Sequence, residues 1–239
     1  MSRATTLTAD QIVRAAVALL DEEGLDGLNM RALGKRLDAA ATAVYWHIKT
    51  KDELVRLAAD AVWQEAELTA VGGGGGDEGE GWRAAATASA QSLWGVVGRH
   101  PWLSPAYGAY VIYGPGKARH DDNELAIYEA AGFGAREAWS AAATVLTYVM
   151  GSGLLPALQA GLARRFTEGG KAAADAYEAM ADDALEVAKQ FPRLRARIDA
   201  EAAEWSAPAG SGFDFGLNAI LDGFEVALAR GRGGGPGQG

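Results

Sequence analysis

The segment from residue 29 to residue 48, NMRALGKRLDAAATAVYWHI, constrains the fold more than any other part of the chain. Apolar residues recur at helical spacing in each half of it: Met30, Leu33 and Leu37, then Val44 and Ile48. Asp38 lies between the two sets, and Asp tolerates the left-handed backbone of a tight bend better than most residues. The pattern predicts two short helices joined by a turn. Such a helix-turn-helix places its second helix in the major groove of DNA.

Capping signals mark a helix on each side of this motif. Thr8 to Gln11 has the form of a capping box, and the helix that follows is expected to end at Gly24. Its predicted buried stripe consists of Ile12, Ala16, Leu19 and Leu20. Thr50 to Glu53 forms a second capping box, which opens a helix expected to reach about residue 68. Four helices are therefore predicted in the first 68 residues.

The remainder of the chain favours an all-α fold, because Ala and Gly are abundant, strand formers are sparse and apolar residues recur at helical spacing. Further helices are expected at about 82–99, 102–108, 118–131, 135–160, 170–190, 193–204 and 213–230. We predict a DNA-binding domain at 1–50 and a helical effector-binding and dimerisation domain at 51–231. The Gly-rich run 72–81 is expected to be a flexible loop, and 232–239 a disordered tail.

Composition excludes several classes of protein and site. The chain has no cysteine, so disulfides and thiolate metal sites are excluded, and we expect neither metal nor cofactor. No stretch is expected to be apolar enough to span a bilayer, so no membrane partner is predicted. The first residues lack a signal-peptide core, which makes the cytoplasm the expected location.

The net charge of −9 at first argues against binding nucleic acid. Residues 1–60, however, carry eight Lys and Arg against nine Asp and Glu, a net of −1, so the rest of the chain carries −8. Basic side chains gather around the two-helix motif: Arg31, Lys35, Arg36, Lys49 and Lys51. Salt screens charges beyond roughly 8–10 Å, so a local basic face is enough to contact DNA.

The second motif helix, about residues 41–47, is the predicted reading element. Ala41 and Ala43 are small enough to approach the groove floor, although they are also simply good helix formers. Thr42 can bond a base edge or a phosphate. Arg31, at the start of the preceding helix, is a long bidentate donor suited to guanine; the alternative is a solvated surface arginine.

Tyr45, Trp46 and His47 form an aromatic cluster at the end of the reading helix. Aromatic residues at helix ends usually pack in a core. Here Val44 and Ile48 already occupy the inward face, so the cluster should point outward, and an outward aromatic cluster calls for a partner surface. We expect Tyr45 to touch a base or phosphate, and Trp46 and His47 to straddle the backbone.

These residues resemble the tetracycline-repressor (TetR) family of bacterial regulators, above all from Gly24 to Leu54 with its Val-Tyr-Trp-His-Ile-Lys-Thr-Lys run. Gly132-Phe133 and the segment 213–224 also look like the C-terminal domain of the tetracycline-repressor branch. The resemblance places Arg31 at the family's base-reading position and Lys51 at a phosphate contact. Ala41-Thr42 replaces the family's Gln-Pro-type pair, so the operator sequence does not carry over.

The middle of the chain is rich in aromatic residues, which either pack an ordinary core or line a cavity for a flat small molecule. The resemblance favours an effector cavity. Together the two arguments give these candidate ligand contacts: Glu67, Ser89, Leu93, Tyr107, Tyr110, Glu124, Tyr128 and Thr147. The family's magnesium-binding histidines are replaced, at Tyr107 and Thr147, which argues against a tetracycline–magnesium chelate. A large, mostly apolar or aromatic effector is expected instead.

By the same resemblance, helices at about 135–160 and 213–230 pair two subunits as a four-helix bundle. The predicted apolar faces are Ala141, Val145, Tyr148 and Val149 on one, and Leu217, Ile220, Leu221, Phe224 and Leu228 on the other. A twofold homodimer reading a palindromic operator follows. An effector that tilts the fourth helix would change the spacing of the reading helices and release the DNA.

Two other classes of function remain open at this point. An enzyme lacks support, because there is no Gly-x-Ser-x-Gly elbow, no complete phosphate-binding loop and too few histidines for a zinc site. A helical protein that binds a small molecule or a protein partner without acting through DNA is the second alternative. Whether the regulator represses or activates, and which genes it controls, does not follow from the sequence.

Overall fold

The computed structural model describes residues 7–69, 78–204 and 211–233. Every regular element in this described part is an α-helix, which confirms the predicted all-α class. In chain order the helices are α1 (Ala9–Gly27), α2 (Met30–Arg36), α3 (Ala41–His47), α4 (Lys51–Trp63), α5 (Glu78–Arg99), α6 (Leu103–Ala109), α7 (Pro115–Ala131), α8 (Ala135–Ser152), α9 (Leu154–Ala188), α10 (Pro192–Glu204) and α11 (Ser211–Gly233).

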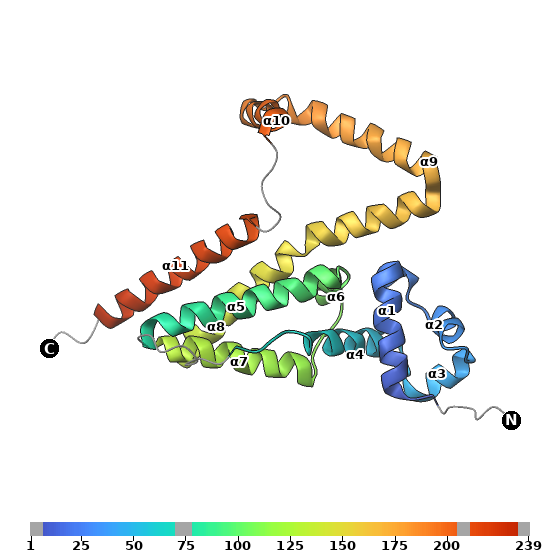
Figure 1. Ribbon diagram of the computed structural model, residues 1–239, viewed down its shortest axis with the longest axis horizontal. Helices are drawn as coiled ribbons and strands as arrows, with labels where there is room; N and C mark the ends of the chain where they lie inside the picture. The colour runs from blue at the N-terminus through green and yellow to red at the C-terminus, as the bar shows by residue number, and fades with distance from the viewer. Residues whose placement is uncertain (1–6, 70–77, 205–210, 234–239) are drawn as a thin grey trace. The chain divides into compact units, whose positions relative to one another are not determined.

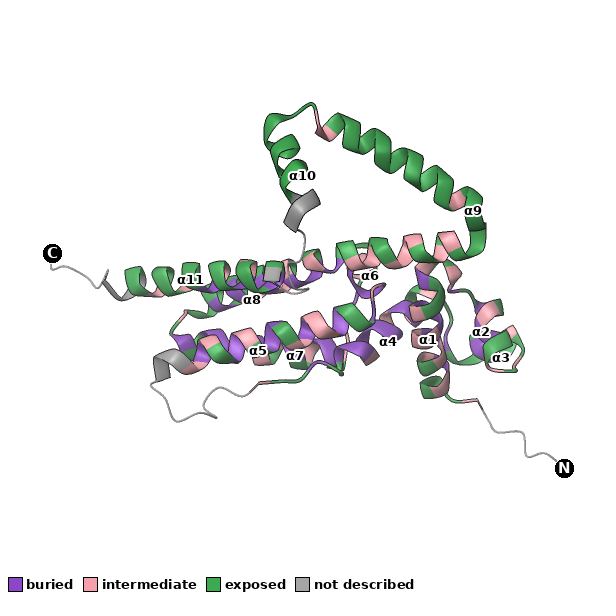
Figure 2. Ribbon diagram, turned by 45° about the horizontal axis from the view of Figure 1, so that its top comes forward, coloured by how far each residue is buried: buried purple, intermediate pink, exposed green. Residues whose placement is uncertain are grey.

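The helices form two compact units (Figure 1). The main unit contains the described residues up to Ala157 and those from Leu217 onward, and the second unit is Leu158–Gly216. Helix α9 has no buried residue, and Figure 2 shows α9 and α10 exposed along nearly their whole length. Part of the predicted 72–81 loop is helical, since α5 begins at Glu78. The rest of that loop and residues 234–239 of the predicted tail lie outside the described residues.

The three N-terminal helices form as the local signals predict. Thr8 and Gln11 make the expected capping box, and Gly24 interrupts α1 with a φ of 71°. Asn29 caps α2 by accepting the Ala32 N–H at 2.8 Å. Asp38 has a φ of 49°, which makes it the one non-glycine residue with positive φ in the described chain. The left-handed backbone predicted at the bend between α2 and α3 is therefore confirmed.

The start of α4 differs from the predicted capping box in one bond. Thr50 accepts the Glu53 N–H at 3.0 Å as expected. The Glu53 carboxylate does not reach back to the Thr50 N–H; it accepts the N–H of Lys49 at 2.8 Å instead. The helix ends at Trp63, before the expected limit near residue 68.

Helix α4 lies at the centre of the main unit, where it packs against α1 on one side and α7 on the other. Its side chains Leu54, Val55, Ala58, Ala59, Val62 and Trp63 are buried. Asp60 is also buried, and its Oδ1 accepts the Lys117 N–H at 3.0 Å, so α4 caps the first turn of α7. A carboxylate there also complements the positive end of the helix dipole.

Two glycines permit this close contact between α4 and α7. A Cβ on Gly114 would lie 2.4 Å from the Asp60 Cγ, and a Cβ on Gly116 would lie 2.5 Å from the Asp60 carbonyl oxygen. Real Cβ atoms do not approach other atoms so closely. Any side chain at these positions would push the two helices apart.

The predicted helix at 135–160 is wrong, because α8 ends at Ser152 and a new helix starts at Leu154. A Cβ on Gly153 would meet Ser104 Oγ at 2.2 Å and Val97 Cγ1 at 2.3 Å, so the chain turns where only glycine fits. The helix predicted at 170–190 likewise starts earlier, at Leu154, with an interruption at Gly170, whose φ is 58°.

The predicted dimer faces of α8 and α11 are also largely wrong. Ala141, Val145 and Val149 of α8 and Leu217 and Leu221 of α11 are buried inside the protomer. On α8 these residues face the core formed with α5 and α7, because they recur at helical spacing on its inner side. Only Tyr148 on α8, and Ile220, Phe224 and Leu228 on α11, keep partial exposure.

The hydropathy of α8 and α9 corrects the expectation about membrane-spanning segments. Within the described residues, Ala135–Ala188 contains a window of mean hydropathy 1.5 that is apolar enough to cross a membrane by length and composition. The expectation that no stretch reaches this level is therefore wrong. The same apolar content occurs in core helices, and the inner face of α8 is packed in the main unit.

We predict that Gly116→Ala lowers the free energy of unfolding by about 1–3 kcal/mol, because the new Cβ would overpack the contact with Asp60. Urea unfolding at fixed protein concentration measures the change. The matched control is Gly98→Ala on α5, where a Cβ meets nothing within 4 Å and alanine should stabilise the helix by up to about 1 kcal/mol. Equal unfolding free energies for the two variants would contradict the tight α4–α7 contact.

Candidate functional site

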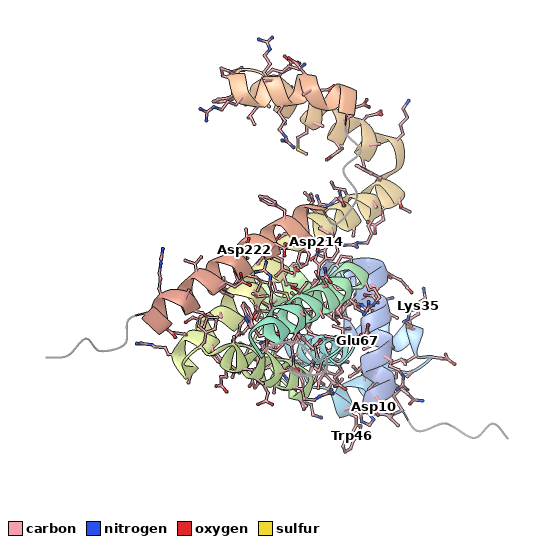
Figure 3. All side chains as sticks on the ribbon, turned by 60° about the vertical axis from the view of Figure 1, so that its left-hand side comes forward. Asp10, Lys35, Trp46, Glu67, Asp214 and Asp222 are labelled. Atoms are coloured by element: carbon pink, nitrogen blue, oxygen red, sulfur yellow. The ribbon has the colours of Figure 1, made fainter. Side chains whose placement is uncertain are left out.

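Helices α2 and α3 present an exposed face built on a buried apolar seam. Val44 and Ile48 are fully buried, whereas Tyr45 is 46% exposed and Trp46 is 80% exposed. His47 is also exposed. The predicted outward direction of the three aromatic residues is therefore confirmed, and Figure 3 shows Trp46 and Lys35 at the periphery of these helices.

The turn between α2 and α3 is tight because Gly34 has no side chain. A Cβ there would lie 2.7 Å from the Ala39 carbonyl oxygen and 3.3 Å from the Ala41 nitrogen. The contact fixes how α3 leaves α2, and it holds Thr42 exposed near the start of α3 beside the half-buried Ala41 and Ala43. The approach of these small side chains to the groove floor stays a prediction.

The basic residues around the motif divide into two groups. Arg31 and Lys35 are exposed and have no protein partner among the described residues. Arg36, by contrast, forms a bidentate ion pair with Glu22, at 2.5 and 2.7 Å, which holds α2 to α1. The expectation that Arg36 belongs to an open basic face is wrong, since its guanidinium already faces a carboxylate.

The two lysines beyond α3 also have internal partners. Lys49 Nζ donates to the carbonyl oxygens of Tyr45 and Trp46 at 3.0 Å and lies 5.6 Å from the centre of a Trp46 ring. A cation there satisfies the C-terminal carbonyls of α3. Lys51 Nζ is half-buried and donates to the Leu25 carbonyl at 2.7 Å, so one of its N–H groups is already used. Its phosphate contact stays a prediction.

A cavity of about 120 Å³ lies in the helical body, between α6, α7 and α8. The lining residues are Tyr107, Lys117, His120, Asp121, Glu124, Leu125, Trp139, Ala142, Ala143 and Leu146. Two of the predicted ligand contacts, Tyr107 and Glu124, are among them. Trp139 is 60% exposed, so an aromatic surface is accessible from outside.

The other predicted ligand contacts lie elsewhere. Ser89 sits one step behind the cavity, where its hydroxyl donates to the Glu124 carboxylate. Tyr128 and Leu93 are fully buried beyond the lining, and Tyr110 is half-buried outside it. Glu67 and Thr147 are exposed; the Glu67 N–H donates to Ser92 Oγ at 2.7 Å, and the Thr147 hydroxyl donates to the Ala143 carbonyl at 2.8 Å. None of these six is a lining residue.

The α7 side of the cavity consists of residues that the sequence analysis did not single out: Lys117, His120, Asp121 and Leu125. With Glu124 they recur at the 3-1-3-1 spacing of one helix face. A mostly polar stripe at this helical spacing was therefore the sequence signal that pointed to these lining residues. The small α8 residues Ala142 and Ala143 carried no comparable signal.

The polar groups of the cavity are buried and only partly paired. Lys117 Nζ binds Asp121 at 2.6 and 2.7 Å and lies 5.1 Å from a Trp63 ring centre. Both ring nitrogens of His120 lack a hydrogen-bond partner among the described residues, although the side chain is almost completely buried. Buried polar atoms without partners are costly, so these two nitrogens are candidates for a hydrogen bond with a ligand or an ordered water.

Burial shifts the pKa of three side chains at the cavity. Burial lowers the pKa of His120 to about 4, with Asp121 opposing and Lys117 adding to the effect, so the imidazole is neutral at pH 7. Burial raises the pKa of Glu124 to about 7, although the Ser89 hydrogen bond opposes it. Burial and the Asp121 charge raise the pKa of the Tyr107 phenol. The side chains of His120 and Tyr107 are therefore uncharged at neutral pH, and they can form hydrogen bonds with a ligand without placing a charge against it.

Residues that line the cavity contact α4. The His120 ring meets Trp63 edge-on, with ring centroids 4.9 Å apart, and Tyr107 lies 6.5 Å from the same tryptophan. Lys117, which lines the cavity, also donates its backbone N–H to Asp60 of α4. No group of three His, Cys, Asp or Glu side chains in the described part of the chain is arranged to hold a metal ion.

Comparison with known proteins agrees with this arrangement of helices. Residues 12–58 match the family described as bacterial regulatory proteins, tetR family, and residues 75–228 match the tetracyclin repressor-like C-terminal domain. An HTH-type transcriptional regulator of Saccharopolyspora erythraea is 34% identical over 92% of this chain and 85% of its own length. The Escherichia coli class A tetracycline repressor from transposon 1721 is 31% identical over 92% of this chain and 91% of its own.

Among solved structures, the Streptomyces coelicolor TetR family protein ActR in complex with actinorhodin superposes with a TM-score of 0.69. It is 25% identical and covers 92% of this chain and 96% of its own. The matched families and relatives are transcriptional regulators and not enzymes. With both halves of the chain matched and its helix-turn-helix in place, this protein belongs to the TetR family of bacterial transcriptional regulators.

Proposed function

We propose that this regulator is a repressor that binds a palindromic operator as a homodimer and leaves it when a small, largely apolar or aromatic effector occupies the cavity. The observation that carries the proposal is the contact between cavity-lining residues and α4. The same helix that meets His120 through Trp63 also packs against α1 of the DNA-binding region. A ligand and an operator can thus be coupled through one rigid element.

For DNA recognition we propose α3 as the reading helix, with Ala41, Thr42 and Ala43 facing the groove floor. Tyr45 would touch a base or a phosphate, and Arg31 would read a base edge. The sugar-phosphate backbone would be contacted by Trp46, His47 and Lys51. The exposure of Arg31 supports this role, because a bidentate donor without an internal partner is available to a guanine. The ion pair of Arg36 with Glu22 removes it from the candidates.

For the effector we propose a flat molecule with a hydroxyl or carbonyl group. Trp139, Leu125 and Leu146 offer it an apolar surface, and ActR shows that a member of this fold binds actinorhodin. Neutral His120 can donate to or accept from a polar group, because each of its ring nitrogens lacks a partner among the described side chains. Tyr107 and Glu124 add further hydrogen-bonding groups at the same cavity.

The dimer would form through the outer faces of α8 and α11, since their inner faces pack within the protomer. On α11 the exposed Ala219, Gly223 and Val226 form an outward stripe of small and apolar residues. The α11 helix is held in place by Arg83 of α5, which binds Asp222 at 2.6 Å and Glu225 at 3.0 Å; Figure 3 labels Asp222 on α11. Two subunits would place two copies of α3 about one DNA turn apart.

We place the protein in the cytoplasm, where its operator is.

Arg31→Ala should weaken binding to the cognate operator by about 1–3 kcal/mol while leaving the protein folded, because one bidentate base contact is lost. The operator is first selected from a random DNA pool, and affinity is then measured by fluorescence anisotropy. Arg119→Ala on α7 removes the same charge from an exposed site away from α2 and α3 and serves as control. Equal affinities for the two variants would reject Arg31 as a reading residue.

His120→Phe should keep operator affinity but weaken release by effector about tenfold or more, because the ligand loses a buried hydrogen bond. The measurement is the dose of a planar hydroxylated compound, drawn from a panel including actinorhodin, that releases half of the bound DNA. Thr147→Val alters a side chain outside the cavity and should leave the dose unchanged. If Thr147→Val raised the required dose and His120→Phe left it unchanged, the effector would not bind at this cavity.

A further inference from the structure

A second polar cluster, in which His100 is buried and its carboxylate partners are partly exposed, joins α1 to the junction between α5 and α6, away from the effector cavity. His100 follows α5, is more than nine-tenths buried, and bridges two carboxylates. Its Nδ1 lies 2.7 Å from Asp21 Oδ1 on α1, and its Nε2 lies 3.2 Å from both carboxylate oxygens of Glu65, just after α4. Trp102 Nε1 also donates to Asp21 Oδ1, at 2.7 Å.

The geometry determines the protonation of this histidine. A neutral imidazole has one N–H, so it would leave the lone pair of its other nitrogen facing a carboxylate. Only the doubly protonated ring can donate to Asp21 and Glu65 together. Burial alone would lower the pKa of His100, but the hydrogen bonds and charges of Asp21 and Glu65 outweigh it and raise the pKa. Arg99, which binds Glu65 at 3.0 Å, is the other charged group of the cluster.

The last turns of α1 connect this cluster to the helices that face DNA. Asp21 binds His100, the next residue Glu22 binds Arg36 of α2, and the Leu25 carbonyl accepts Lys51 of α4. Three neighbouring positions on α1 thus contact the body, α2 and the start of α4. A shift of α1 at Asp21 must therefore move α2, and with it α3, relative to the body.

We propose that His100 is a positioning residue for DNA recognition: its protonated ring locks α1 to the α5–α6 junction, and the lock makes operator affinity depend on pH. The proposal uses the DNA-binding function of the family and does not involve the effector cavity. When the ring loses its proton, one of the two bonds to carboxylates is lost and α1 is less firmly held. A less ordered DNA-binding region then loses more conformational freedom on binding, so affinity falls.

The direction with pH follows from linkage. A histidine whose pKa is raised on folding contributes stability that is fully present below its ordinary pKa of 6.5. That contribution is lost as the pH rises through the raised pKa of the folded protein. Operator affinity should follow the same course, strong at mildly acid pH and weaker at alkaline pH.

The test compares the protein that has His100 with its His100→Gln variant. Operator affinity is measured by fluorescence anisotropy from pH 6 to pH 9, on an operator selected from a random DNA pool. Both proteins carry His47→Gln, because His47 lies on α3, the proposed reading helix. At pH 6 the His100→Gln protein should bind about fivefold or more weakly than its His100 parent, a size typical of allosteric coupling. The two curves should converge as the pH rises. Parallel curves, or equal or tighter binding by His100→Gln at pH 6, would overturn the proposal.

Two further variants separate the lock from general damage. Trp102→Phe removes one hydrogen bond to Asp21 but no charge, so it should weaken binding while the fall with pH persists. Asp21→Asn removes one carboxylate and should shift that fall to lower pH, because His100 then loses its proton sooner. In the absence of DNA, thermal unfolding at constant protein concentration should show a loss of stability with rising pH that His100→Gln lacks. A fall of operator affinity with pH that Asp21→Asn leaves unchanged would overturn the lock. Unfolding curves of the His100 protein and of His100→Gln that shift equally with pH would overturn it independently of any DNA measurement.

Discussion

The close contact of α4 with α7 is the constraint on which the rest of the main unit depends. Asp60 caps the first turn of α7, and the glycines at 114 and 116 let the two backbones meet. Trp63, one turn further along α4, is thereby set against His120 at the wall of the cavity. Because α4 also packs on α1, a single helix joins the N-terminal helices to the helices that line the cavity. Packed helices shift as units, which makes such a joint suited to switching.

Internal partners decide which charges of this acidic protein are available to DNA. Arg36, Lys49 and Lys51 each bind a carboxylate or a carbonyl oxygen of the protein, whereas Arg31 and Lys35 have no such partner among the described residues. The internal bonds fix the ends of α1, α2 and α3 relative to α4. Arg36 and Lys49 thus serve to hold the scaffold together, whereas Arg31, Lys35 and the remaining N–H groups of Lys51 stay available to the operator.

The two buried histidines of the main unit illustrate how surroundings select a role. His100 faces two carboxylates and keeps its charge, which suits it to joining helices. His120 faces Trp63 and a cavity, with no hydrogen-bond partner from the described residues, and burial keeps it neutral. A neutral ring with both nitrogens unpaired is stabilised by a ligand, whereas a paired cation is stabilised by the fold itself.

The sequence by itself determined the features that depend on neighbours within a few residues. The capping of α1 by Thr8, the left-handed turn at Asp38 and the outward aromatic cluster after Val44 all follow from local spacing and backbone preference. Only the tertiary structure decided which faces of α8 and α11 are buried, that Arg36 pairs with Glu22, and that Lys117 and His120 line a cavity. Those outcomes depend on which helices meet. In alanine-rich helices several faces are apolar enough to be the inner one, so local pattern cannot choose among them.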